Sequence, residues 1–286
     1  MPRNLLVLAV LLVARAAPAQ DGVTLRYAPT PGATARLLTE IRTTTSLTGF
    51  PAVPDGATVI TETRVNATQR VLDVAPGGWL VEVVVDSVRA RRRSEGAAWV
   101  DAVDTGMVGR AARAVISDRF EVTGIRTTGP TDGEVLRLLG AGVAGLGFAF
   151  PVNPVPAGTT FASGGRVYAR AHAGLETGIA LDETAFADLS LTLDSAVAEG
   201  GDELVYFHFR APMTPRTVGR ESEDGNQVVT LSGGAAGRLV WSRAWNAFVG
   251  GATRLRVEGT IRAQTPTGAV DARAGWDTTI LHQLRP

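Results

Sequence analysis

Three glycines near the middle of the chain have a spacing that binds dinucleotides in other proteins. Gly140, Gly142 and Gly145 satisfy G-x-G-x-x-G, and in a nucleotide-binding fold such a loop follows a buried strand and opens a long helix aimed at a pyrophosphate. The context opposes this chemistry, because Arg137 would lie inside the buried strand and prolines follow a few residues after Gly145. We interpret the motif as an apolar connector and expect no cofactor.

The residue types that support hydrolysis or metal binding do not gather in a known pattern. His172, His208 and His282 are far apart, the chain has no cysteine, and no closely spaced metal-ligand set occurs. Ser163 and Ser232 precede glycine pairs but lack the leading glycine of a G-x-S-x-G nucleophile motif. A triad or carboxylate pair drawn from distant parts of the chain stays open. We expect a protein that is not an enzyme and has no metal site.

Two tryptophans and one arginine form the first candidate ligand-binding surface. Trp241, Arg243 and Trp245 recur at every second position, so in a strand they would share one face. A charged residue between two indoles can form a cation–π ladder or line a groove that holds a sugar or a lipid. The alternative is an amphipathic face partly covered by a loop.

A run of arginines forms the second candidate surface, a contact for an anion. Arg91, Arg92 and Arg93 belong to the densest cluster of charge in the chain, and such a cluster can meet an anion or a lipid headgroup. It can equally be the solvated end of a strand, or an edge charged against aggregation. All 28 basic residues are arginines, a bias that a GC-rich genome explains without any binding role.

Apolar and polar residues alternate along most of the chain, which predicts β-strands. The two candidate surfaces would therefore lie on strands. Thr253–Ala263 places Leu255, Val257 and Ile261 on one face and charged side chains on the other, which is typical of an antiparallel strand with one buried face. Segments at 35–48, 57–74, 79–88 and 269–284 have similar patterns. A Pro-Gly-Gly turn after residue 75 predicts a hairpin between the second and third of these.

We therefore predict a mainly β protein in which long antiparallel strands form two curved units, each like an open sheet, a barrel or a sandwich. Capping-box spacing from Thr131 predicts a short helix over 131–147, and the following prolines end it. The expected organisation is an N-terminal β unit at 20–130, a helix and proline-rich connector at 131–158, and a C-terminal β unit at 159–286.

The first nineteen residues are typical of a secretory signal peptide. Basic Met1–Asn4 precedes the apolar run Leu5–Ala14, and Ala17 and Ala19 are the small residues that a signal peptidase reads. We expect cleavage before Gln20 and export to the periplasm or the extracellular space. Loss of two arginines with the signal lowers the 28 basic residues to 26 against 28 acidic ones, so we expect no nucleic-acid partner. No later segment has the roughly 20 apolar residues of a membrane-spanning helix.

The order of these pieces resembles exported bacterial β proteins of uncharacterised function. The resemblance is carried by the opening strand with its Pro-x-x-Gly turn at Leu25–Gly32, the connector Pro151–Gly158 and the late strand pair from Gly233-Gly234 onward. A more distant likeness is to envelope lipid carriers of the lipoprotein-carrier kind, whose curved sheet wraps helices around an apolar cavity. These resemblances imply a β fold, and the second implies a lipid cavity. They transfer no functional residue.

Together these features predict an exported, non-enzymatic protein of the cell envelope. It would bind a lipid or another amphipathic molecule, or an envelope protein, through a concave β surface. The alternatives are a structural or interaction module with no ligand, and a secreted hydrolase. The oligomeric state stays open.

Overall fold

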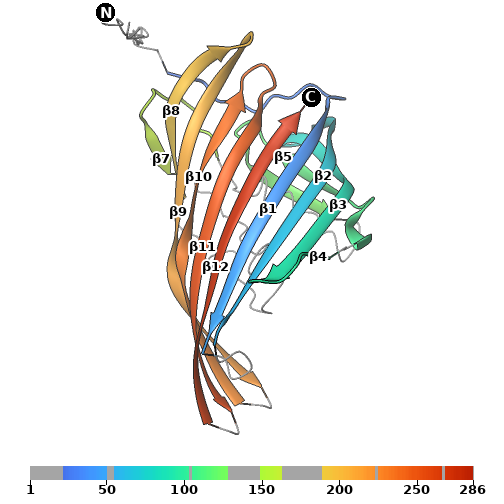
Figure 1. The fold of residues 1–286 in the computed structure, drawn as a ribbon. Helices are drawn as coiled ribbons and strands as arrows, with labels where there is room; N and C mark the ends of the chain where they lie inside the picture. Colours follow the sequence, from blue (N-terminus) through green and yellow to red (C-terminus); the bar gives the residue numbers. More distant parts are fainter. Residues whose placement is uncertain are drawn as a thin grey trace, which may run out of the picture.

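The protein is built on a single antiparallel β-sheet, which confirms the prediction of a mainly β fold. The computed structural model describes residues 22–49, 55–102, 105–127, 149–162, 189–222, 225–265 and 268–285, with twelve strands and the short 3₁₀ helix η1 (Thr105–Met107) (Figure 1). The strands are β1 (Thr34–Thr48), β2 (Ala57–Ala75), β3 (Gly78–Ser94), β4 (Val100–Asp101), β5 (Ala111–Ile116), β6 (Val122–Thr127), β7 (Thr160–Ala162), β8 (Ser190–Glu199), β9 (Asp202–Ser222), β10 (Gly225–Ser242), β11 (Ala247–Thr265) and β12 (Gly268–Arg285).

The two halves of the chain meet in the middle of this sheet. The strand order is β6-β5-β3-β2-β1-β12-β11-β10-β9-β8-β7, and β4 pairs with β3 beside this path. The first and last strands are therefore neighbours, with a continuous register from Arg36 opposite Arg285 to Thr48 opposite Arg273. This pairing corrects the expectation of two separate sheets. If the two halves formed separate sheets, β1 and β12 would each be a long edge strand with unpaired backbone N–H and C=O groups, which are costly to leave exposed. Pairing β1 with β12 satisfies the backbone groups of both edges.

Several predicted segments lie outside the described residues, and others are found as expected. The predicted signal peptide (1–19) and the predicted helix (131–147) belong to the first group. The proline-rich segment from Pro151 to Gly158 is not helical, but it bends at residues 152–153 and turns at residues 157–158 instead of being extended throughout. Within it, Val155 forms an isolated bridge with Val23. The predicted hairpin at Pro76–Gly78 joins β2 to β3. Within the described ranges, no helix has the length and apolar character needed to span a membrane.

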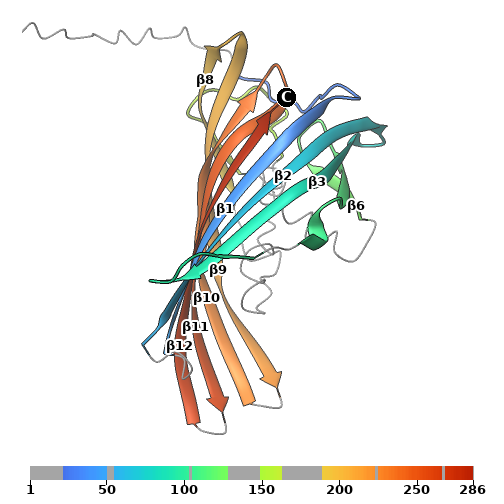
Figure 2. The same ribbon diagram turned by 45° about the vertical axis from the view of Figure 1, so that its right-hand side comes forward.

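The sheet is strongly curved. Trp79 on β3 and Trp241 on β10 are linked by successive ring contacts through Tyr27 and Phe120, with centroid distances of 5.7, 5.3 and 5.7 Å. In a flat sheet, the five strand spacings between β3 and β10 would alone separate these rings by about 24 Å. The sheet therefore bends so that its two sides approach each other across one face, as Figures 1 and 2 show. Register shifts in β2–β3, β8–β9, β9–β10 and β10–β11 are the kind of irregularity that bends long strands.

The two faces of the sheet differ in chemistry, as the alternation predicted. Leu255, Val257 and Ile261 of β11 are buried on the concave side, which we call the inner face, while Arg254 and Arg256 lie exposed on the convex side, the outer face. Residues that pair across neighbouring strands point to the same face, so the same alternation continues from strand to strand. Buried inner-face residues of β1, β2, β3, β9, β10 and β12 include Leu37, Ile41, Val65, Ala67, Val83, Phe207, Phe209, Leu231, Leu239, Ala274, Trp276 and Ile280.

Aromatic residues from distant segments hold the curved sheet together at one end. Phe120 has the left-handed backbone angle φ of 65° and contacts the rings of Tyr27, Phe150, Trp241 and Phe248. A non-glycine residue in this region costs about 1–3 kcal/mol. The four ring contacts stabilise Phe120 there, and the turn that presents it is fixed by hydrogen bonds to one serine.

That serine is Ser117. Its Oγ accepts hydrogen bonds from the backbone N–H groups of Arg119 and Glu121, at 3.2 and 3.0 Å, and its carbonyl accepts one from the N–H of Phe120, at 3.0 Å. The side chain thus replaces backbone partners in a tight turn. The turn aims Phe120 across the concave side of the sheet toward β10.

Candidate functional site

A buried polar band crosses the otherwise apolar inner face where β1 meets β12. On β1 the band contains Thr39, Thr43 and Thr45, and on β12 it contains Thr278 and His282, all of them buried. The register places Thr39 opposite His282 and Thr43 opposite Thr278, and the hydroxyl oxygens of the second pair are 3.0 Å apart. A hydroxyl or imidazole removed from water needs a hydrogen-bond partner, so this band is a place on the inner face where polar contacts are needed.

Two buried nitrogens on β12 have no hydrogen-bond partner among the described residues. They are Nδ1 of His282 and Nε1 of Trp276. They lie on the same face, six residues apart along one strand, which corresponds to about 20 Å. A buried polar atom without a partner costs about 1–3 kcal/mol. Each nitrogen is therefore a buried hydrogen-bonding group of the inner face whose bond is not made by the described residues.

The His282 imidazole is neutral because its burial disfavours the charged form. Burial lowers its pKa from 6.5 to about 4. A neutral imidazole has one N–H donor and one acceptor nitrogen, while the indole of Trp276 only donates. The band therefore offers hydrogen bonds without charge. Of the buried residues that the structure describes on β1 and β12, none is acidic or is an arginine.

A glycine on the neighbouring strand positions the ring of Trp276. A Cβ atom added at Gly259 of β11 would lie 3.3 Å from the Trp276 ring and 3.0 Å from Leu231. The indole therefore lies across the bare backbone of β11. Gly237 of β10 has the same relation to Phe209, since its Cβ would be 2.5 Å from that ring. In glycine–aromatic neighbours of this kind, the ring packs over the glycine backbone and covers the space that a side chain would otherwise fill.

Apolar residues flank the band on both sides. On one side lie the β9–β11 residues Met213, Val229, Leu231, Leu255, Val257 and Ile261, and on the other lie the β2, β3 and β5 residues Val65, Val81, Val83, Val85 and Ala112, all buried. The inner face is thus amphipathic. A narrow polar band without charge runs along β1 and β12, and wide apolar surfaces lie on both sides of it. No described residues form a cluster of three or more metal-ligating side chains.

The first predicted surface does not have the expected geometry. Trp241 is buried on the inner face and packs against Phe150 and Phe248, at 4.9 Å in each case. Strand β10 ends at Ser242, so Arg243 and Trp245 lie in the following turn rather than on the same strand face. The turn forms because Asp202 accepts hydrogen bonds from Ser242 and the N–H of Ala244. Arg243 pairs with Glu203 at 2.5 Å, and Trp245 is 42% exposed.

The second predicted surface is divided by the strand alternation. Arg91 and Arg93 point to the outer face and lie over the ring of Trp99, at 4.5 and 4.8 Å from its centroid, while Arg92 alternates to the opposite side. Arg91 also donates two hydrogen bonds to Glu62, at 2.8 and 2.6 Å. A role of these arginines toward an anion stays a prediction, and two of them are already engaged by groups of the protein.

The remaining candidates are scattered. His208 lies on the outer face with Nδ1 2.6 Å from Asp194, and Ser232 is exposed on the same face. His172, Ser163 and the glycine motif at 140–145 lie outside the described residues. Sequence reasoning missed the polar band, although the alternation pointed to it. Thr39, Thr43 and Thr45 lie an even number of residues from Leu37 and Ile41, and His282 lies an even number from Trp276 and Ile280. These polar residues therefore fall on the same face as the buried apolar ones.

The fold and this inner face define an open, curved antiparallel β-sheet protein with an amphipathic interior. No family model matches the chain, and no curated protein matches it. Among solved structures it is similar to lipovitellin, in a structure solved to describe lipid–protein interactions in that protein, with 8% identity and a TM-score of 0.52. The match covers 91% of this chain and 26% of lipovitellin, so the chain spans about a quarter of that protein's length. At this identity the similarity concerns the fold.

Proposed function

We propose that this protein is a non-enzymatic binder of amphipathic lipids that holds its ligand against the inner face of the curved sheet. The observation that carries the proposal is the pair of buried nitrogens without hydrogen-bond partners, His282 Nδ1 and Trp276 Nε1, within an apolar surface. The fold likeness to lipovitellin supports it, because lipid–protein interactions are described for that protein. Export to the cell envelope, expected from residues 1–19, is part of the proposal.

The chemistry of the band favours a lipid with an uncharged polar group. His282 is neutral and its neighbours on the band are threonines, so the band would not compensate a buried phosphate or carboxylate charge. An ester or hydroxyl group can accept a hydrogen bond from the indole N–H or exchange one with the imidazole. The two nitrogens lie about 20 Å apart along β12, so separate polar groups would bond them. Acyl chains would lie on the apolar flanks. An acylglycerol has this composition.

Binding of two probes tests the proposal. The mature protein is first analysed by native mass spectrometry for bound lipid, then delipidated and titrated with a fluorescent acylglycerol and with diphenylhexatriene, a hydrocarbon that makes no hydrogen bonds. In His282→Leu we expect acylglycerol affinity to fall about 5-fold, which corresponds to one hydrogen bond of about 1 kcal/mol. Hydrocarbon affinity should stay unchanged.

His208→Leu is the matched control, because His208 lies on the outer face with its side chain 43% exposed. It should change neither affinity. A wild-type protein that carries no lipid and takes up neither probe contradicts the proposal and favours a structural or interaction module without a ligand.

A further inference from the structure

A second groove lies on the outer face, on the opposite side of the sheet from the proposed lipid site. Its volume is about 710 Å³. Strands β12, β1, β2 and β3 form its floor, and β4 lies along one side through Asp101. The charged residues that line it are Glu40, Glu62, Asp101, Arg42, Arg64, Arg89 and Arg91. Four arginines thus face three carboxylates, and the groove carries an excess of positive charge.

Two of the four arginines form ion pairs with a single carboxylate, that of Glu62. Glu62 forms ion pairs with Arg42, at 3.2 Å, and with Arg91, at 2.6 Å. Arg91 also lies over the ring of Trp99, as Arg93 does. Arg42 and Arg91 are therefore already engaged.

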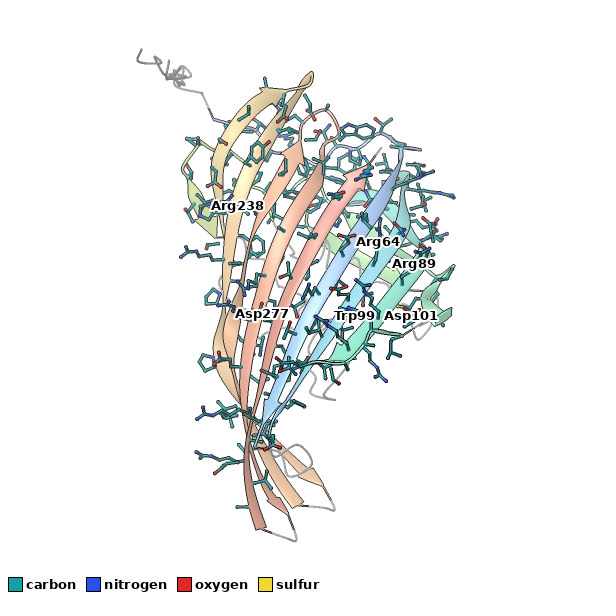
Figure 3. The ribbon with its side chains drawn as sticks, viewed as in Figure 1. Arg64, Arg89, Trp99, Asp101, Arg238 and Asp277 are labelled. Carbon is teal, nitrogen blue, oxygen red and sulfur yellow. The ribbon has the colours of Figure 1, made fainter. Side chains whose placement is uncertain are left out.

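The excess charge is concentrated on Arg64 and Arg89. These residues face each other directly across β2 and β3, a position that brings Cβ atoms to about 4.5–5.5 Å and that is destabilising for like charges. Arg64 has one long contact with Glu40, at 3.7 Å, and its side chain is 56% exposed. Arg89 has no ion pair with any residue that the structure describes. Figure 3 shows the two side chains next to each other, close to Trp99 and Asp101.

We propose that Arg64 and Arg89 bind a phosphate group in this groove. Two adjacent guanidinium groups present parallel N–H pairs that match the oxygens of an oxyanion. A phosphate monoester has three terminal oxygens that accept hydrogen bonds, so it can accept an N–H pair from each guanidinium group, whereas a carboxylate has two oxygens. The exposed side chain of Leu281, which also lines the groove, gives an organic phosphate an apolar contact.

This site is independent of the inner face. It uses Arg89, from the same arginine run as Arg91–Arg93, together with Arg64 on the neighbouring strand, and a role of Arg91–Arg93 toward an anion stays a separate prediction. The phosphate can belong to a soluble metabolite or to a phospholipid headgroup in a membrane surface, and the chemistry at Arg64 and Arg89 is the same in both cases.

The test compares two double variants with equal net charge. Arg64→Gln/Arg89→Gln removes the pair, and Arg210→Gln/Arg238→Gln removes two exposed arginines of the same outer face on β9 and β10, where Figure 3 labels Arg238. Glutamine keeps a polar side chain, and thermal unfolding of both variants checks that they fold. Binding of phenyl phosphate is measured by calorimetry and by Trp99 fluorescence. Binding to vesicles of phosphatidylcholine with and without phosphatidic acid is measured by co-sedimentation.

We expect the first variant to lose at least 10-fold in affinity and the control to stay within 2-fold of the wild type. Loss of phenyl phosphate binding indicates a soluble ligand, and a loss confined to phosphatidic acid vesicles indicates a headgroup. Equal losses in both variants would show only a general effect of net charge and would overturn the proposal. So would a wild-type protein that binds neither probe. Lipid uptake on the inner face should be unaffected, so the two proposals can fail separately.

Discussion

Phe120 contacts the edge of Trp241 at a centroid distance of 5.7 Å, although the two residues lie on opposite sides of the sheet order. Phe120 belongs to the turn after β5, and Trp241 is near the end of β10. The contact therefore bridges the two arms of the curved sheet. The same ring also touches Tyr27, Phe150 and Phe248, so this one side chain joins residues from both arms of the curved sheet.

Phe120→Ala should lower the free energy of unfolding by about 3–5 kcal/mol, the range for truncating a buried phenylalanine. Trp245→Ala serves as the control, since Trp245 is 42% exposed in a turn, and its effect should stay within about 1 kcal/mol. Urea denaturation followed by circular dichroism gives both values. A Phe120 variant as stable as the wild type would show that the arms of the sheet are held together elsewhere.

His282 should make the fold less stable as the solution becomes acidic. Its pKa in the folded protein is about 4, below the ordinary 6.5, so the unfolded chain binds a proton that the folded chain does not. Stability from this residue is present above pH 6.5 and is lost as the pH falls toward 4. The full loss is about 3 kcal/mol, from 1.36 kcal/mol per pKa unit.

His282→Leu tests this dependence, because leucine has no titrating group. The variant should be at least as stable as the wild type at neutral pH, since it removes a buried nitrogen without a partner. Its stability should fall less between pH 6.5 and 4. Urea titrations at several pH values measure the difference between the two proteins, and parallel curves would contradict a neutral, buried His282.

Gly237→Ala should destabilise the sheet by about 1–3 kcal/mol through overpacking. The added Cβ would be 2.3 Å from the carbonyl oxygen of Ala252 and 2.5 Å from the ring of Phe209, and the backbone of β11 cannot yield easily. Gly275→Ala is the control, because its closest atom is the hydroxyl of Ser46, at 2.7 Å, which can rotate away. Thermal unfolding should separate the two variants by several degrees.

The signal peptide prediction is tested by the mass of the secreted protein. Expressed with its full sequence in a bacterium that has a periplasm, the protein should be recovered from the periplasm or the medium with Gln20 as its first residue. Ala19→Arg places a bulky charge at the residue before the predicted cut, and it should leave the precursor uncleaved. Intact mass spectrometry identifies both forms. Wild-type protein that stays in the cytoplasm at its full mass would remove export from the proposal.

Local pattern alone determined much of the architecture. Alternation predicted that Leu255, Val257 and Ile261 share a buried face, and the Pro-Gly-Gly turn predicted the β2–β3 hairpin. Both depend on neighbours within a few residues, where backbone geometry couples side chains at every second position. The same rule failed at Trp241, Arg243 and Trp245, because alternation holds only while the strand continues and β10 ends at Ser242.

The single sheet and both proposed sites depend on contacts that the sequence does not encode locally. The pairing of β1 with β12 joins residues more than two hundred positions apart, and it creates the polar band by placing Thr39 opposite His282. The pairing of β2 with β3 likewise places Arg64 opposite Arg89. The amino-acid sequence by itself determined which face of each long strand is mainly apolar. Only the tertiary structure decided which strands become neighbours, because that choice depends on long-range register and on the aromatic contacts that curve the sheet.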